Sequence, residues 1–173
     1  MNYFLGIDPG KKGGFVLLDE LGNYVKSWRM PSLTRDITSQ SIANIYYNIN
    51  SVTNEIKPTV FLERIFTAPF DGRVGLMTYA QEAGRLEMCA LWRWPIHLVH
   101  PKTWMSKIHM GLPKKLEAKE KSLHSFMLRF PYLCDKGSDF WPESSKKPLD
   151  GLVDAALIAE YGRIWVIKEQ KNI

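Results

Sequence analysis

The stretch LGIDPGKKGGFVLLDE, residues 5–20, joins two short apolar runs through a segment rich in glycine and lysine. Short apolar runs bounded by glycine or proline are typical of buried strands, so we expect strands over residues 2–8 and 13–19. After the turn DELGNY, the segment YVKSWRM, residues 24–30, alternates in polarity and is followed by Pro31. The N-terminal part of the chain is therefore predicted to form an antiparallel meander of three strands.

Beyond the meander, the pattern predicts helices that alternate with strands. Apolar residues at three- and four-residue spacing are typical of amphipathic helices that cover a sheet. They predict helices over residues 36–54, 75–94, 115–130 and 149–169, with short apolar strands over 59–66 and 96–101. The order βββαβαβα predicts an α/β fold: a mixed five-stranded sheet, three antiparallel strands and then two parallel ones, flanked by helices.

The composition indicates a basic protein with one core. A chain of 173 residues that is 45% hydrophobic can bury one sizeable core, so we expect a single domain over residues 1–173. The net charge of +5 and the pI near 9.2 favour a polyanionic partner. No apolar run approaches the roughly 20 residues that cross a bilayer, and the N-terminus lacks the features of a secretory signal.

Only two cysteines are present, Cys89 and Cys134, and we expect both to be reduced thiols. These features predict a cytoplasmic location, or an organellar matrix or the cytoplasm of an infected host, with no secretion and no membrane partner.

Four carboxylates stand where apolar packing cannot stabilise a charge. Asp8 ends the first expected strand, and Glu63 interrupts the apolar strand VFLERIF. Asp150 and Asp154 are four residues apart and so share one face of the last helix, where Asp154 interrupts an apolar stripe. Taken singly, Asp8 is equally well explained as a turn former, Glu63 as an ion-pair partner and Asp150 as a helix N-cap.

Taken together, the four acids supply hard oxygen ligands, which suit magnesium or manganese better than zinc. Such a cluster can hold two metal ions about 4 Å apart, one activating water and the other stabilising the leaving oxygen in phosphodiester hydrolysis. The acids therefore predict nuclease chemistry.

Three segments, LGIDPGKKGG, VFLERIF and DGLVDAALIAEYG, resemble the catalytic segments of RuvC-type Holliday junction resolvases in the RNase H-like superfamily, particularly the phage and organellar members. The resemblance covers nearly the whole chain in order and spacing, and it implies an RNase H-like nuclease domain. It assigns catalysis and metal binding to Asp8, Glu63 and the final acidic pair. It also implies a homodimer that cuts four-way DNA junctions by paired symmetric nicks, with two Mg²⁺ ions per active site, for which Mn²⁺ can substitute.

The final acidic pair departs from the bacterial pattern. Bacterial members commonly space this pair by three residues, whereas Asp150 and Asp154 are four apart. Both spacings place the pair on one helical face, so the cluster is preserved. Which metal ion each of the two contacts stays open.

The resemblance also suggests residues that contact DNA. Phe66 would insert at the junction centre, although it can equally be a core residue, and Phe70 and Arg73 would lie on a loop along the DNA. Lysines before and within the helix over 115–130 would contact phosphates, helped by its N-terminus. The expected lysine contacts are Lys102, Lys107, Lys114, Lys115 and Lys119, and also Lys147, which stands just ahead of Asp150 and would lie against the scissile strand. The prediction concerns the group, since any single lysine is equally well explained as a solvated surface residue.

Two further expectations concern packing. The helix over 75–94 resembles the dimer-forming helix of the family, and packing within its own subunit explains its small residues equally well. Four tryptophans are expected to pack in the core rather than to stack on bases: Trp92, Trp94, Trp104 and Trp141.

Other functions fit parts of the pattern. A catalytically idle junction-binding protein of the same fold would not need all four acids. An actin-like ATPase or sugar kinase also places an aspartate before glycine on a first hairpin, but 173 residues cannot supply its second lobe. Another RNase H-like nuclease, acting on flaps, forks or RNA/DNA hybrids, shares the spacing, so substrate competition must distinguish it from a junction resolvase.

Overall fold

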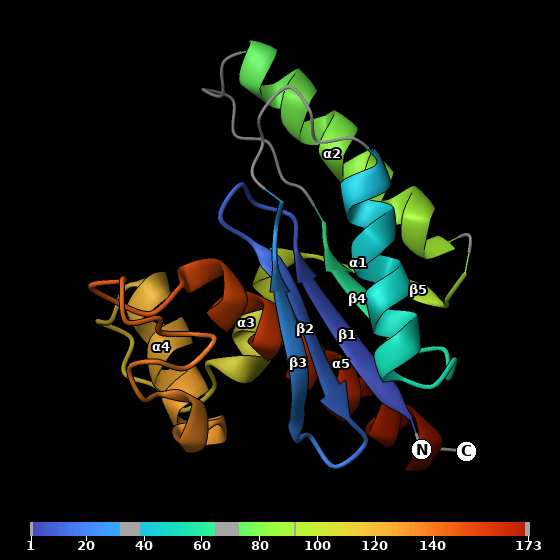
Figure 1. The fold of residues 1–173 in the computed structure, drawn as a ribbon. Helices are drawn as coiled ribbons and strands as arrows, with labels where there is room; N and C mark the ends of the chain where they lie inside the picture. Colours follow the sequence, from blue (N-terminus) through green and yellow to red (C-terminus); the bar gives the residue numbers. More distant parts are fainter. Residues whose placement is uncertain (1, 32–38, 65–72, 92, 172–173) are drawn as a thin grey trace.

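The centre of the protein is a mixed five-stranded sheet, seen in a computed structural model that describes residues 2–31, 39–64, 73–91 and 93–171. The antiparallel strands are β1 (Tyr3–Asp8), β2 (Gly14–Asp19) and β3 (Tyr24–Arg29). On the other side of β1 lie two strands parallel to it, β4 (Thr59–Glu63) and then β5 (Ile96–Val99). The strand order β3-β2-β1-β4-β5 confirms the predicted sheet (Figure 1).

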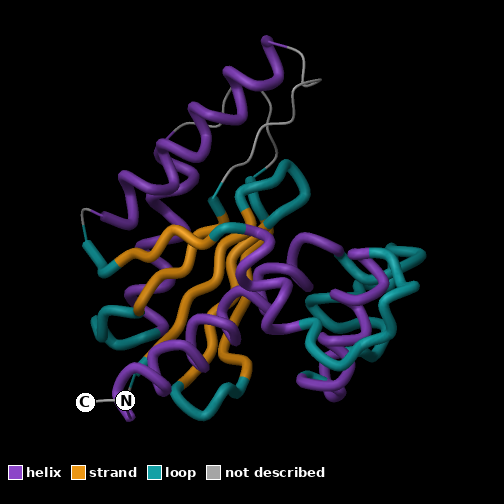
Figure 2. The backbone as a smooth tube through the Cα atoms, turned by 180° about the vertical axis from the view of Figure 1, so that it is seen from behind, coloured by secondary structure: helices purple, strands orange, loops and turns teal. Residues whose placement is uncertain are grey.

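Helices cover both faces of this sheet (Figures 1 and 2). One face carries α1 (Ser39–Val52) and α2 (Arg73–Leu91), and the other carries α5 (Asp150–Lys171), against which α3 (Pro101–Ile108) and α4 (Ala118–Arg129) pack. Successive side chains of a strand point to opposite faces. Leu5 and Ile7 of β1 therefore pack with α1, whereas Phe4 packs with α5. None of the described helices has the length and apolar character to cross a bilayer.

Gly6 allows α5 to lie directly on β1. A Cβ atom at Gly6 would lie 2.1 Å from the Ala155 carbonyl oxygen and 2.4 Å from the Ala159 backbone nitrogen. The facing residues of α5, Ala155 and Ala159, are small and fully buried. This close approach fixes the height of α5 above the sheet, and with it the position of Asp154.

The four predicted helix ranges lack one helix of the structure, α3, and the order βββαβαβα ends on one helix where the structure has three, α3, α4 and α5. In the structure, α3 follows β5 at once, and a short 3-10 turn, η1 (Pro131–Leu133), follows α4. α3 begins with Pro101 in its first turn, and its buried residues are Trp104 and Ile108. A helix of two turns is too short for its apolar periodicity to be distinguished from a loop.

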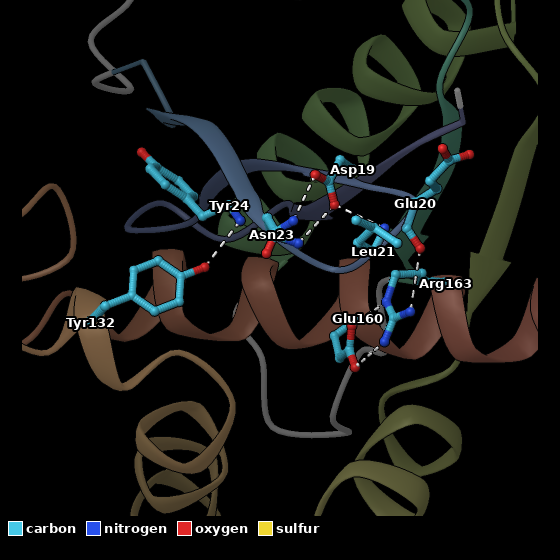
Figure 3. Close-up of polar contacts among 8 residues, drawn as sticks. All are labelled: Asp19, Glu20, Leu21, Asn23, Tyr24, Tyr132, Glu160 and Arg163. Carbon is cyan, nitrogen blue, oxygen red and sulfur yellow. Dashed lines mark hydrogen bonds and ion pairs between the residues drawn. The ribbon is translucent and has the colours of Figure 1, made fainter.

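The turn between β2 and β3 lies near the start of β1 and is hydrogen-bonded to α5 (Figure 3). Within the turn, Asp19 Oδ1 accepts backbone hydrogen bonds at 2.9 and 2.8 Å, and Gly22 has a positive φ of 88°. On α5, Arg163 donates to both oxygens of Glu160, at 2.7 and 2.9 Å, and to the Glu20 carbonyl oxygen at 3.4 Å. The turn predicted from DELGNY is thus confirmed, and it is anchored to the last helix.

Candidate active site

Three carboxylates from separate elements meet at one end of the sheet. Asp8 is the last residue of β1 and Glu63 the last residue of β4, and these parallel strands are direct neighbours. Asp154 lies in the second turn of α5, the helix that packs on β1. Each of the three carboxylates is half-buried. The negative charge of a neighbouring acid raises the pKa of each one: Glu63 acts on Asp8, Asp154 on Glu63, and Asp8 on Asp154. Three of the four predicted acids therefore form one cluster.

Burial is the main cause of the altered pKa values of Asp8 and Asp154. It raises the pKa of Asp8 to about 6, against a hydrogen bond of 2.9 Å from the Gly10 N–H, and the charge of Glu63 adds to the rise. Burial raises the pKa of Asp154 to about 7, where a hydrogen bond from Ser122 opposes the rise and the charge of Asp8 adds to it. Mutually repelling carboxylates of this kind are neutralised by a divalent cation.

Glu63 is held by a tryptophan of α3. The Nε1–H of Trp104 donates to Glu63 Oε1 at 2.8 Å. Burial raises the pKa of Glu63, the Trp104 hydrogen bond lowers it, and the charge of Asp154 raises it further. Trp104 is fully buried, as its expected packing role requires. The hydrogen bond from Trp104 to Glu63 was not predicted from the sequence. The general rule that a buried indole N–H needs an acceptor could have suggested it.

One oxygen of Asp154 has no hydrogen-bond partner. Among the described residues, Asp154 Oδ1 is the buried side-chain oxygen without a donor. Leaving a buried polar group unpaired costs about 1–3 kcal/mol, which fits a group that binds a ligand. Carboxylate oxygens are the donors that Mg²⁺ prefers, so the cluster fits this ion by its chemistry. As the side chains stand, no three acidic, histidine or cysteine groups of the described residues converge closely enough to hold a metal ion.

Asp150 differs from the other three acids. Lys119 Nζ lies 3.1 Å and Lys147 Nζ 3.5 Å from the same atom, Asp150 Oδ2. The Asp150 side chain is 41% exposed. Although burial raises its pKa, the hydrogen bonds and charges of the two lysines bring it below the usual range. The three residues line a pocket of about 180 Å³ that also reaches Asp154, so the fourth predicted acid lies at the rim of the site.

The glycine-rich loop after Asp8 packs against the start of α5. A backbone hydrogen bond of 2.7 Å from the Gly13 N–H closes this loop. A Cβ atom at Gly151 would lie 2.1 Å from the Lys12 carbonyl oxygen. Glycine is therefore required where the last helix meets the loop. Residues 5–20 thus contain most of β1 and β2. Their glycine-rich loop also allows α5, which carries Asp154, to approach Asp8.

Two of the predicted DNA contacts, Lys119 and Lys147, lie at this site beside Asp150. Four other predicted lysines are exposed on α3 or before α4, outside the pocket at the acids: Lys102, Lys107, Lys114 and Lys115. Two aromatic contacts lie outside the described residues, Phe66 and Phe70. For Arg73, the first residue of α2, the structure describes the backbone alone.

Comparison with known proteins gives matches at the level of structure. No protein-family model and no curated protein sequence matches the chain. RuvC of T. thermophilus in complex with a Holliday junction substrate is similar over 97% of this chain and 96% of its own, with a TM-score of 0.63 and 15% sequence identity. Another Thermus thermophilus RuvC structure is similar over 96% of both chains, with a TM-score of 0.57 and 17% identity. The yeast mitochondrial Holliday junction resolvase Ydc2 is similar over 96% of this chain and 80% of its own, with a TM-score of 0.59 and 16% identity.

These similarities confirm the fold that the sequence predicts. The chain shares the RNase H-like fold of the RuvC-type resolvases over nearly its whole length. At one end of this sheet lie the half-buried carboxylates of Asp8, Glu63 and Asp154.

Proposed function

We propose that this protein is a magnesium-dependent endodeoxyribonuclease that resolves four-way DNA junctions by paired, symmetric phosphodiester hydrolysis, with residues 1–173 as one nuclease domain. The observation that carries the proposal is that Asp8 and Glu63, at the ends of neighbouring strands, lie at the same end of the sheet as Asp154 of α5, which has an unpartnered buried oxygen. The fold shared with a RuvC bound to a Holliday junction substrate supports the substrate class.

The three half-buried acids would hold Mg²⁺, two ions per site, with Mn²⁺ as a substitute. In such sites these ions supply activation of water and stabilisation of the leaving oxygen of a phosphodiester. The Gly10 N–H keeps one oxygen of Asp8 in place at 2.9 Å. Burial of Asp8 and Asp154 excludes water from around their carboxylates, which strengthens their attraction for a cation.

Asp150, the fourth predicted ligand, would act together with Lys119 and Lys147. The two lysines now neutralise its carboxylate from 3.1 and 3.5 Å. A DNA phosphate that enters the adjoining pocket competes for both ammonium groups, since phosphates bind lysines through charge-assisted hydrogen bonds. Asp150 is then free to turn towards the other acids. DNA binding and completion of the acidic cluster are coupled in this way.

We further propose that the active form is a homodimer, because symmetric cuts in a two-fold junction require two sites related by a two-fold axis. α2 offers a surface for this contact. Met88 and Leu91 are 62% and 52% exposed, and residues three apart lie on one face of a helix.

Other activities are distinguished by experiment. A nuclease of the same fold acting on flaps, forks or RNA/DNA hybrids would use the same acids. A catalytically idle junction-binding protein would need no buried acidic cluster, and the mutual repulsion of the three carboxylates would only destabilise it.

A synthetic four-way junction, with each strand labelled in turn, tests the proposal. The junction is incubated with wild type and with Asp154→Asn, with and without Mg²⁺, and Asp135→Asn removes an exposed carboxylate as the matched control. We expect paired symmetric nicks from wild type and Asp135→Asn in Mg²⁺, and junction binding without nicks from Asp154→Asn. Junction binding by wild type without nicks in Mg²⁺ or Mn²⁺ would instead support the idle protein. If flaps, forks or RNA/DNA hybrids are cut in preference to the junction when the substrates compete, the preferred one is the substrate and the junction is not.

A further inference from the structure

Trp104 is buried beside the acidic cluster and is hydrogen-bonded to one of its carboxylates. Its side chain is 0% exposed, and its Nε1–H donates to Glu63 Oε1 at 2.8 Å. Within the described part of the chain, the Glu63 carboxylate receives no other hydrogen bond. An indole has one donor and no acceptor, so the whole polar capacity of Trp104 is directed at Glu63.

The indole is held firmly in this position. Val99, the last residue of β5, pairs with Glu63, so α3 begins beside the end of β4. Trp104 belongs to the core cluster on the α5 face of the sheet, and its ring meets the His109 ring edge-on at a centroid distance of 5.7 Å. A fully packed side chain cannot change rotamer without displacing its neighbours. The N–H therefore points at Glu63 in a fixed direction.

We propose that Trp104 is a positioning residue for the metal site: its N–H holds Oε1 of Glu63, so that the carboxylate presents Oε2 to the cation. This inference rests on the proposed function, because Glu63 needs such positioning only as a metal ligand. Groups that hydrogen-bond to metal ligands fix the orientation of those ligands, and their loss lowers metal affinity or activity about 10–100-fold.

Trp94 is the matched control for Trp104. It is also buried, at 4% exposure, but it belongs to the core cluster on the opposite face of the sheet, where its ring packs on Tyr46 at a centroid distance of 4.9 Å. Replacement by phenylalanine leaves a cavity at either position. At position 104 the same replacement also removes a hydrogen bond to the site.

Magnesium affinity separates positioning from packing. Mg²⁺ binding to wild type, Trp104→Phe and Trp94→Phe is measured by calorimetry without DNA, and by the Mg²⁺ dependence of single-turnover junction cleavage. We expect Trp104→Phe to bind Mg²⁺ about 10–100-fold more weakly with unchanged junction affinity, and Trp94→Phe to keep the wild-type Mg²⁺ affinity. In a Glu63→Ala background, Trp104→Phe should cause no further loss, because no carboxylate remains to be positioned.

The outcomes distinguish this inference from the proposed function. Wild-type Mg²⁺ affinity in Trp104→Phe, with a lower melting temperature alone, would overturn the inference and leave the nuclease intact. A wild-type protein that neither binds Mg²⁺ nor cuts DNA would overturn the proposed function. If Trp104→Phe does not fold, benzothienylalanine in place of Trp104 keeps the ring shape without the N–H. We expect the same loss of Mg²⁺ affinity there, and an unchanged affinity would again overturn the inference.

Discussion

Asp154 and Asp150 are one helical turn apart on α5, yet their environments are opposite. Asp154 has a buried oxygen without a partner, whereas Asp150 is 41% exposed and paired with two lysines. We expect Asp154→Asn to slow single-turnover junction cleavage about a thousandfold or more, as a loss of roughly 4 kcal/mol of transition-state stabilisation would. Asp150→Asn should slow it about tenfold, because it removes the acid that completes the cluster on DNA binding while the other three acids remain. Equal losses in the two variants would contradict this difference.

The raised pKa values of Asp8 and Asp154, about 6 and about 7, make the stability of the metal-free protein depend on pH. Both carboxyl groups have an ordinary pKa of 3.8, so between about pH 4 and pH 7 the folded state binds more protons than the unfolded state. The contribution of these two carboxyl groups to the free energy of unfolding therefore falls as pH rises through this range, and levels off above it.

Urea unfolding in EDTA, at pH values on either side of this range, measures the effect. We expect Mg²⁺ to restore stability at the higher pH, because it neutralises the charges that repel. Asp154→Asn should flatten the pH profile. The same pH profile in Asp154→Asn and wild type would show that Asp154 does not have a raised pKa in the folded protein.

At single residues, the sequence predicts acids better than it predicts their partners. Asp8, Glu63 and Asp154 are predictable because a charge that interrupts an apolar run must have water, a partner or a metal. The hydrogen bond of Trp104 and the pairing of Lys119 with Asp150 join residues far apart in the chain. These contacts depend on how α3 and α4 pack against α5, which no local pattern encodes.

Among the elements, the site depends most on how closely α5 lies on β1. A methyl group at Gly6 would meet backbone atoms of Ala155 and Ala159 at 2.1 and 2.4 Å. We expect Gly6→Ala to destabilise the protein by about 1–3 kcal/mol or more through overpacking, and to weaken Mg²⁺ binding because α5 carries Asp154. Urea unfolding and calorimetry measure the two effects. Adding Ala159→Gly should not restore stability, because the nearest clashing atoms are backbone. Wild-type stability in Gly6→Ala would show that the helix lies further from the strand.

Elements differ in how far the sequence predicts them. The strands and the long helices carry enough residues for a period to be read, and their bounds in the structure lie within a few residues of the expected ones. α3 has eight residues, of which Trp104 and Ile108 are buried. Pro101 in its first turn is a local signal for the start of a helix. The shortest helix, and the one that supplies the donor to Glu63, is therefore the one that periodicity misses.

For the whole molecule, the order of the elements is enough to predict the sheet. Three strands joined by short connections form a meander, and strands separated by helices return parallel, so few arrangements are possible. The acids then meet because β1 and β4 are parallel neighbours whose ends lie at one edge. The sequence pattern does not predict which residues contact a second subunit. A surface that joins two copies consists of exposed residues, which do not recur at a regular spacing along the chain.

The proposed dimer gives the last prediction. Met88 is 62% exposed on α2, and a charge there should prevent two apolar helix faces from meeting. We expect Met88→Glu to sediment as a monomer with wild-type Mg²⁺ affinity, because the acids lie on other elements. It should nick one strand of a junction at a time instead of making paired cuts. Met127→Glu, at a side chain 50% exposed on α4, is the matched control and should remain dimeric with paired nicks. A dimeric Met88→Glu would place the interface elsewhere, and a monomer that still makes paired nicks would contradict the coupling of two subunits to two cuts.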